Sequence, residues 1–325
     1  MHRNLPSIWL GISFTMLLWP ALKNWNRAQV VCLLASVALA VALCGTVFSG
    51  NFLAVPHCCV FFTLIGWVVV RKFGAFDPSF AARKFFMYHL VANILFLCFA
   101  RWMPQSRSGT ALLLIALCIF SSSFPFHGWI EHFFSHAPAC LVAVFLLFLR
   151  PFVWFFTLQF LSVIISIENF DAFRKIFTAL GALGCLFVPI LFFSKKENRK
   201  LLGYMLCWQN GILWLLLSCC KLYSYIFLFE LSVIQGILLT LLFFSFVEMQ
   251  KQRRSDEIIC FGSIYRLKKL WGFTVCSAFS LLGTWPLLMC WSIRVPYLCS
   301  MGSAASCLLY FCFTYRAFLR ESVGL

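Results

Sequence analysis

The amino-acid sequence predicts an all-α polytopic membrane protein of about eleven transmembrane helices in a single domain, residues 1–325. Hydrophobic residues make up 62% of the chain and charged residues only 11%, whereas soluble domains hold roughly 45–50% and about 25%. The apolar residues are gathered in runs near the ~20 residues that one helix needs to cross a bilayer. A soluble enzyme or a nucleic-acid-binding protein could not bury this much apolar surface, so both classes are excluded.

The apolar runs follow one another along the chain with short polar loops between them. They are predicted as helices because the bilayer core leaves backbone N–H and C=O groups no other partner. The run at 139–166 is too long for one perpendicular crossing and contains Arg150 and Pro151, so a tilt or a kink is expected there. In order, the runs cover 7–22, 29–48, 52–70, 85–103, 109–124, 139–166, 175–194, 201–219, 225–247, 270–293 and 296–315.

The basic residues between the runs predict an orientation. Eighteen of the 26 lysines and arginines lie in loops that follow odd-numbered runs, and seven lie on the opposite side. Because cytoplasmic loops carry the excess of basic residues, the odd-numbered loops are predicted to be cytoplasmic, with the N-terminus outside and the C-terminus inside. We expect a multi-pass protein of a bacterial inner membrane, and a mitochondrial inner membrane is the less favoured alternative.

The cysteines give no sign of a cofactor. Seventeen are present, mostly inside the apolar runs, and no two have C-x-x-C spacing. Buried free cysteine behaves as a small hydrophobic residue, and no glycine-rich phosphate loop accompanies these cysteines. The sequence therefore predicts no cofactor and no metal bound by this chain.

One segment between two apolar runs concentrates titratable residues. Histidine titrates near neutral pH and can pass protons, and a broken helix at membrane depth is tolerated where protein or water covers the freed backbone. We predict a proton or ion path at a broken helix, and an ordinary interfacial loop is the alternative. Within the segment, Pro125 and Pro138 bracket His127, His132 and His136, with Trp129 and Glu131 between them.

Two charged residues lie inside apolar runs. Arg150 interrupts the run at 139–166, and Glu230 lies in the run at 225–247. A charge at this depth costs a few kcal/mol or more unless it faces a cavity or a partner. A buried base and a buried acid on different helices suggest a charge relay. The alternatives are a structural ion pair, or an arginine that reaches to the membrane interface.

Four blocks in serial order resemble antiporter-like membrane subunits, which occur in respiratory NADH–quinone oxidoreductase (chain M or chain 4 type) and in multisubunit cation/proton antiporters. The segment PFHGW at 125–129, with Ala137 and Pro138 after it, is similar to the family's P-[LF]-H-x-W signature and its later A-P pair. KFFMY at 84–88, RKLLGY at 199–204 and YRAF at 315–318 are similar to three further family blocks. Pro125, Trp129, Pro138 and Lys200 are motif residues within these blocks, and the resemblance covers roughly residues 50–320.

The resemblance implies two inverted repeats, approximately 49–166 and 173–320, each with a broken helix. In the family, a glutamate and lysines along the bilayer midplane form a proton path. In this chain, Arg150 stands one position from the expected register of one lysine, and Glu230 falls about where the family has a histidine. Neutral residues stand at four other titratable positions of the family: Asn51, Phe120, Phe134 and Gln209.

The resemblance implies a degenerate and truncated antiporter-like subunit that translocates protons or another cation, coupled to electron transfer in a respiratory complex. The chain would hold no redox centre itself, and its partners would be other membrane subunits and the lipid bilayer, with no nucleic acid. The path candidates are His127, His132, His136, Arg150 and Glu230. The alternatives are a non-pumping structural or assembly subunit, and a carrier for another solute.

Overall fold

In the computed structural model of the chain, the described residues are 54–75, 77–102, 107–164, 170–194, 197–219 and 225–253. They form an all-helical bundle. The predicted runs at 7–22, 29–48, 270–293 and 296–315 lie outside these residues. The total of about eleven helices and the inverted repeats at 49–166 and 173–320 therefore stay predictions.

Every predicted run between residues 52 and 247 corresponds to helical structure. Within the run at 139–166, the described residues 139–164 form one continuous helical stretch in which a short π-helical segment, η2, precedes Arg150. The elements are α3 (Ala54–Phe73), α4 (Pro78–Trp102), α5 (Arg107–Phe120), α6 (Ile130–His136), α7 (Ala139–Val144), η2 (Phe145–Leu149), α8 (Arg150–Ile164), α9 (Phe170–Phe193), α10 (Asn198–Cys219) and α11 (Tyr225–Arg253).

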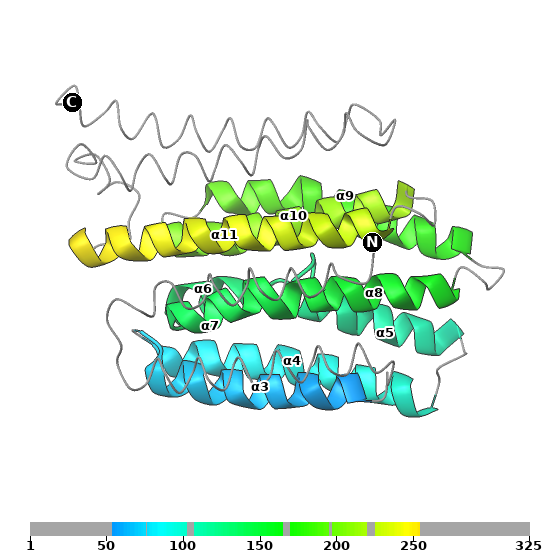
Figure 1. The fold of residues 1–325 in the computed structure, drawn as a ribbon, viewed down its shortest axis with the longest axis horizontal. Helices are drawn as coiled ribbons and strands as arrows, with labels where there is room; N and C mark the ends of the chain where they lie inside the picture. Colours follow the sequence, from blue (N-terminus) through cyan, green and yellow to red (C-terminus); the bar gives the residue numbers. More distant parts are fainter. Residues whose placement is uncertain are drawn as a thin grey trace, which may run out of the picture.

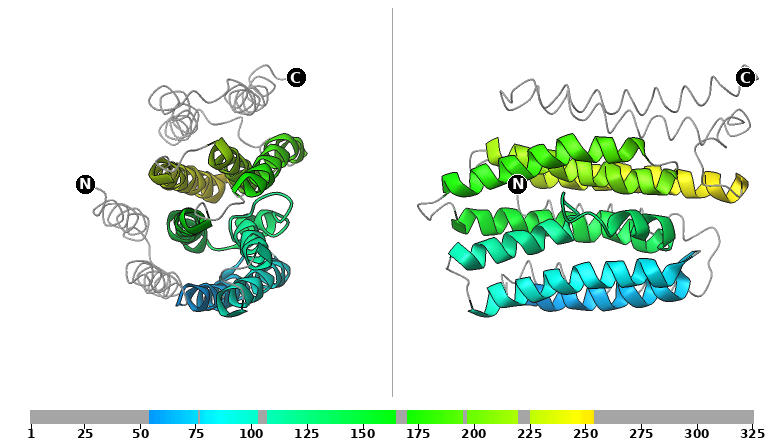
Figure 2. Two further views of the ribbon diagram at one scale, coloured as in Figure 1. Left: turned by 90° about the vertical axis from the view of Figure 1, so that its right-hand side faces the viewer. Right: turned by 180° about the vertical axis from the view of Figure 1, so that it is seen from behind.

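The helices lie side by side along the long axis of the molecule (Figure 1). α3 and α4 form one edge of the described bundle, α5 to α8 form its middle, and α9 to α11 form the opposite edge, as the end-on view in Figure 2 also shows. α5 and α6 lie toward opposite ends of the bundle, with residues 121–129 between them. Together, α5 and α6 take the place of one interrupted helix.

Five helical stretches among the described residues are long and apolar enough to cross a membrane, which confirms the prediction of a multi-pass membrane protein. They are Pro56–Phe73, Pro78–Phe99, Ala139–Leu158, Phe173–Leu191 and Arg199–Ser218. Two of them are central: 83% of the residues in Ala139–Leu158 and 89% of those in Arg199–Ser218 are buried in the bundle, against 22% in Phe173–Leu191. The two central stretches are therefore surrounded by protein rather than by lipid.

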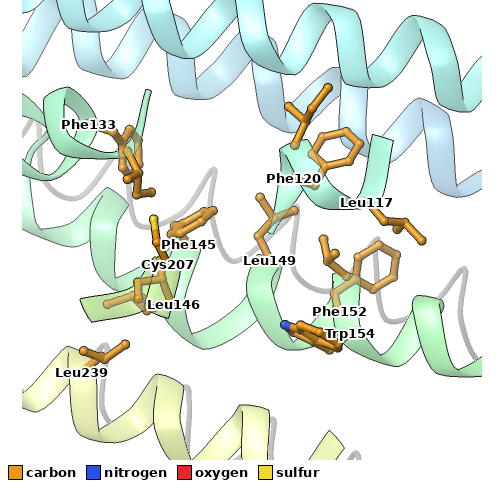
Figure 3. Close-up of a cluster of buried hydrophobic side chains, with 14 of the residues drawn as sticks. Leu117, Phe120, Phe133, Phe145, Leu146, Leu149, Phe152, Trp154, Cys207 and Leu239 are labelled. Carbon is orange, nitrogen blue, oxygen red and sulfur yellow. The ribbon is translucent and has the colours of Figure 1, made fainter. Parts of the chain in front are cut away.

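The core is a layer of aromatic and aliphatic side chains around the central stretch of α7, η2 and α8 (Figure 3). Leu117 and Phe120 reach it from α5, Cys207 from α10 and Leu239 from α11. Between membrane helices such side chains gain van der Waals contacts rather than exclusion from water, and the close packing fixes the helices laterally. Any polar group in this layer must therefore find its partners inside the bundle.

Candidate functional site

The interruption between α5 and α6 is built by local backbone hydrogen bonds and a left-handed residue. α5 ends at Phe120, and Ser122 follows with a φ of 59°. The amide N–H of Ser123 donates to Cys118 O over 2.9 Å, and that of Phe126 donates to Ser123 O over 2.7 Å. α6 then ends before Pro138, which has no amide N–H to continue it. The structure therefore places a break at each of the two proline positions of the histidine-rich segment.

Trp129 holds α6 against its neighbours. Its side chain is completely buried, and its indole Nε1 donates to Ile119 O over 3.3 Å across the break. The indole ring also packs edge-on against Phe85 and His89 of α4 and against Phe145 of η2. Trp129 is thus a packing anchor for the histidine-rich segment rather than a side chain at a membrane interface.

His127 lies in the turn that leads into α6. Its imidazole stacks on Phe124, with ring centroids 5.3 Å apart, and meets the ring of Tyr204 edge-on at 5.9 Å. The side chain is partly buried. This arrangement places an imidazole beside the phenol of α10, within the interrupted part of the bundle.

Lys84, Glu131, His132 and Tyr204 come together at one end of the bundle and are named the α6 cluster. His132 Nε2 lies 3.0 Å from Lys84 Nζ and 3.1 Å from Glu131 Oε1. The hydroxyl of Tyr204 donates to Glu131 Oε2 over 2.7 Å. Four titratable side chains from α4, α6 and α10 therefore form one chain of contacts, and sequence analysis had singled out only His132 among them as a path candidate.

Burial and neighbouring cations govern the charge of His132. Partial burial lowers the pKa of the His132 imidazole below its usual value, and the ammonium of Lys84 lowers this pKa further. The carboxylate of Glu131 opposes both effects by favouring the charged imidazole. The imidazole is therefore mainly neutral at pH 7, because the lowering influences prevail.

Lys200 belongs to a second contact group at the same end of the molecule. Its ammonium lies 2.5 Å from Glu197 Oε1. Ser135 donates its hydroxyl to Glu197 Oε2 over 3.4 Å, and Arg199 donates from Nη1 to Ser135 O over 3.1 Å. These bonds tie the start of α10 to the end of α6, so Lys200 has a structural contact at the position where the sequence predicted a motif residue.

His136 is bound within its own helix. Its Nδ1 lies 3.1 Å from the carbonyl oxygen of His132, one turn earlier, and the two imidazole centroids are 6.3 Å apart. Its own carbonyl accepts the amide N–H of Ala75 over 2.8 Å, which ties α6 to the end of α3. In the part of the chain that the structure describes, no three His, Cys, Asp or Glu side chains gather as metal ligands would.

Arg150 is completely buried in the middle layer of the bundle. Its Nε donates to Asn210 Oδ1 over 3.1 Å, its Nη1 to Ser232 O over 3.2 Å and its Nη2 to Gln235 Oε1 over 2.7 Å. Within the described residues, no carboxylate lies at ion-pair distance from the guanidinium. The cation is therefore solvated by neutral oxygens of α10 and α11.

Asn210 links this cation to the break after α5. Its Oδ1 also accepts from Trp154 Nε1 over 3.3 Å, and its Nδ2 donates to the carbonyl of Ser121. Beyond Ser121, hydroxyl contacts continue to Ser123, whose Oγ accepts from Trp214 Nε1 over 2.6 Å. Arg150, Asn210, Gln235 and Ser121 thus form a polar layer across the bundle, named the Arg150 layer.

Sequence analysis missed the amide residues of the Arg150 layer. Asn210 lies beside Gln209 in the apolar part of α10, and Gln235 lies in the apolar part of α11. A polar residue at that depth is expensive unless it is paired. A polar residue inside an apolar run is thus a signal of a buried polar site even when the residue carries no charge. Glu230 is part of α11, but its side chain lies outside the described part of the structure, so the predicted relay between Arg150 and Glu230 stays a prediction.

The α6 cluster and the Arg150 layer share helix α10. Tyr204 of the cluster and Asn210 of the layer are six positions apart in α10, which corresponds to about 9 Å along a helix axis. Completely buried aromatic side chains, Phe133, Phe134 and Phe145, pack in the same region. The described structure therefore holds a titratable group at one end and a fixed cation deeper in the bundle, with an aromatic layer nearby.

Comparison with known proteins gives matches of structure and none of sequence family. No protein-family model and no curated protein matches the chain. Its fold matches a chain of the membrane-bound sulfane sulfur reductase, an archaeal respiratory membrane complex, with a TM-score of 0.67 and 13% identity over 82% of this chain. It also matches a chain of respiratory complex I from Thermus thermophilus with bound aureothin, with a TM-score of 0.56 and 16% identity over 98% of this chain.

These matches confirm the predicted resemblance to antiporter-like membrane subunits at the level of the fold. The chain spans 61% of the length of the sulfane sulfur reductase chain and 84% of the complex I chain. Both matched chains belong to respiratory membrane complexes.

Proposed function

We propose that this chain is an antiporter-like subunit of a respiratory complex and that it takes part in moving protons, or another cation, across the membrane. The observation that carries the proposal is Arg150, a completely buried cation with no carboxylate partner among the described residues. A bundle that served only as a membrane anchor would gain nothing from a charge at this depth, since an apolar side chain avoids the cost of burying it.

Arg150 would act as a fixed electrostatic element rather than as a proton carrier. Arginine stays protonated at working pH, whereas lysine can release its proton. A permanent cation stabilises the charged form of a nearby acid and opposes a second cation. The positive charge of Arg150 would therefore repel protons that reach the Arg150 layer and set an electrostatic barrier to their passage. A change in the charge of neighbouring groups would raise or lower this barrier. The α6 cluster is the region from which protons would be taken up on the cytoplasmic side.

A vesicle assay tests this proposal. The complex is purified from its native membrane through an affinity tag on this chain and reconstituted in vesicles, and a lumenal dye reports pH after addition of NADH and quinone or after a potassium–valinomycin potential. We expect Arg150→Gln to reduce the initial rate of pH change at least about tenfold, because it removes the charge. Lys72→Gln, on an exposed side chain of α3, is the matched control and should retain the rate.

Retained subunit composition in both variants shows that the complex has assembled. An unchanged rate in assembled Arg150→Gln would contradict a translocating role for this residue.

A non-translocating structural subunit is the second candidate, and one observation favours it. Phe120 and Phe134, which stand where the resembling family has titratable residues, are almost completely buried, and each packs edge-on against another ring. A proton path needs groups that exchange protons, and these two positions offer none. In this case Arg150→Gln would lower the stability of the complex and leave its proton movement unchanged.

A further inference from the structure

We propose that His132 is a proton-uptake site at which protonation exchanges one hydrogen-bond partner for another. In this exchange, the imidazole releases Lys84 of α4 and binds Glu131 of α6. The inference rests on the proposed function for its purpose, but its geometry and its test are independent of transport.

One atom is shared between two incompatible partners. His132 Nε2 lies 3.0 Å from Lys84 Nζ and 3.1 Å from Glu131 Oε1. An ammonium group only donates hydrogen bonds, and an ionised carboxylate only accepts them. A ring nitrogen accepts through its lone pair when bare and donates when it carries a proton. Nε2 can therefore bond Lys84 or Glu131, but not both at once.

The protonation state of the ring selects the partner. The neutral ring with its hydrogen on Nδ1 accepts the Lys84 ammonium at Nε2. When the bond to Lys84 opens, a hydronium ion in the adjoining water gives its proton to the freed Nε2 lone pair and leaves as water. An Nε2–H···Oε1 bond to Glu131 then forms, and the cationic ring repels the ammonium. On return, the proton leaves Nε2 for water and the bond to Lys84 forms again. The side chains of His132 and Glu131 are each 18% exposed, so water reaches the pair.

Neighbouring aromatic residues contact Lys84 and Glu131, the two alternative partners of His132. Lys84 Nζ also lies 4.8 Å from the centre of the Phe80 ring, so a released ammonium keeps a cation–π partner. Glu131 is held from its other oxygen by Tyr204 of α10 over 2.7 Å. The neutral ring therefore ties α6 to α4 through Lys84. The protonated ring bonds instead to Glu131, whose other oxygen is bonded to α10.

Titratable groups from three of the described helices affect the exchange. From α4, Lys84 favours the neutral ring; from α6, Glu131 favours the charged ring and His136 opposes it; from α10, Lys200 opposes it. Burial also lowers the pKa of His132. Uptake of the proton is therefore expected on the acidic side of the usual histidine range of about 6.5.

Residue-specific chemical labelling tests the proposal on the intact, purified complex. Diethylpyrocarbonate acylates neutral imidazole, and peptide mass spectrometry of samples labelled over a pH series gives the midpoint of His132 separately from the other histidines. We expect a midpoint below about 6.5. Lys84→Gln should raise it by roughly half a pH unit or more, because it removes the partner of the neutral ring and a nearby cation. Glu131→Gln should lower the midpoint, because it removes the partner of the charged ring.

Two further variants make the result decisive. Lys84→Arg keeps the charge and the donor and should leave the midpoint within a few tenths of a pH unit of the parent, and Lys72→Gln removes a cation elsewhere at this end of the bundle and should do the same. The exchange is overturned if Lys84→Gln and Glu131→Gln shift the midpoint in the same direction, or if neither shifts it in an assembled complex. If Lys84→Gln raises the midpoint of His132 and Glu131→Gln lowers it, but the complex does not move protons, the proposed function is refuted and the exchange stands.

Discussion

At the scale of single residues, Asn210 is the side chain on which the Arg150 layer depends. Its Oδ1 accepts from both Arg150 Nε and Trp154 Nε1, and its Nδ2 donates to Ser121. Removing one partner of a buried polar group leaves the other unsatisfied, and the penalty is largest when that group is charged. The amide is therefore worth more to stability than a single hydrogen bond.

We predict that Asn210→Leu destabilises the protein by roughly 3 kcal/mol or more, since it strips a hydrogen bond from a buried guanidinium and one from a buried indole. The measurement is the midpoint of detergent-induced unfolding of the purified complex, followed by the fluorescence of tryptophan. Gln209→Leu is the matched control on the neighbouring position, because Gln209 is also buried but its Oε1 has no partner among the described residues. This control should change stability by less than about 1 kcal/mol, and equal losses in the two variants would contradict the role given to Asn210.

The residue scale also shows what the sequence could and could not predict about the site. Arg150 and the histidines of 125–138 stand out because charged and titratable residues are rare in apolar runs. The contact between Lys84 and His132 joins residues 48 positions apart, and only the packing of α4 against α6 brings them together. The neutral partners of Arg150 among the described residues were equally hidden, because they depend on which faces α10 and α11 turn toward α8.

At the scale of helices, the apolar runs predict the existence of each element better than its ends. α4 begins at Pro78, seven positions before the predicted run at 85–103. Asp77 accepts the amide N–H of Phe80 over 3.3 Å, and proline at the first helical position needs no amide partner. α11 likewise continues to Arg253, past the apolar run, because polar and basic residues extend a helix that has already formed. The capping residue Asp77, rather than hydrophobicity, fixes the start of α4.

The segment around Arg150 shows how a helix carries a proline inside the bundle. The amide N–H of Arg150 donates to Phe145 O, five residues back, which is the π-helical pattern of η2. Pro151 has no amide N–H, so in the same register the carbonyl of Leu146 has no donor from residue 151. α11 approaches this carbonyl at Gly236, where an added Cβ atom would lie 2.5 Å from Leu146 O. The irregular helix and the glycine opposite it are therefore one packing unit.

We predict that Gly236→Ala destabilises the protein by about 1–3 kcal/mol, because the new methyl group meets backbone that cannot move aside cheaply. Gly203→Ala is the control: its Cβ atom would lie 3.4 Å from Ile130 O, an ordinary contact, and alanine favours a helix by up to about 1 kcal/mol over glycine. Unfolding midpoints in detergent compare the two. A loss in Gly203→Ala as large as that in Gly236→Ala would argue against close approach of α11 as the cause.

At the scale of the whole molecule, the structure brings together loops that the charge count had assigned to one side. Ala75 bonds His136, and Ser135 bonds Glu197, so the segments after α3, around α6 and before α10 lie at the same end. Lys72 is exposed at this end, and Lys175 is exposed in the first turns of α9, at the other end of the bundle. The two lysines therefore lie at opposite ends of the bundle.

If the excess of basic residues sets the orientation, the end that carries Lys72 and the α6 cluster faces the cytoplasm. We predict that a cysteine introduced as Lys175→Cys reacts with a membrane-impermeant maleimide in intact cells, and that Lys72→Cys reacts only after the cells are permeabilised. The unmodified chain gives the background of its native cysteines, and prior maleimide block followed by permeabilisation verifies the sidedness. The reverse pattern would place the α6 cluster outside the cell, where His132 would take up protons from the opposite compartment and the proposed direction of uptake would fail, although the partner exchange itself would stand.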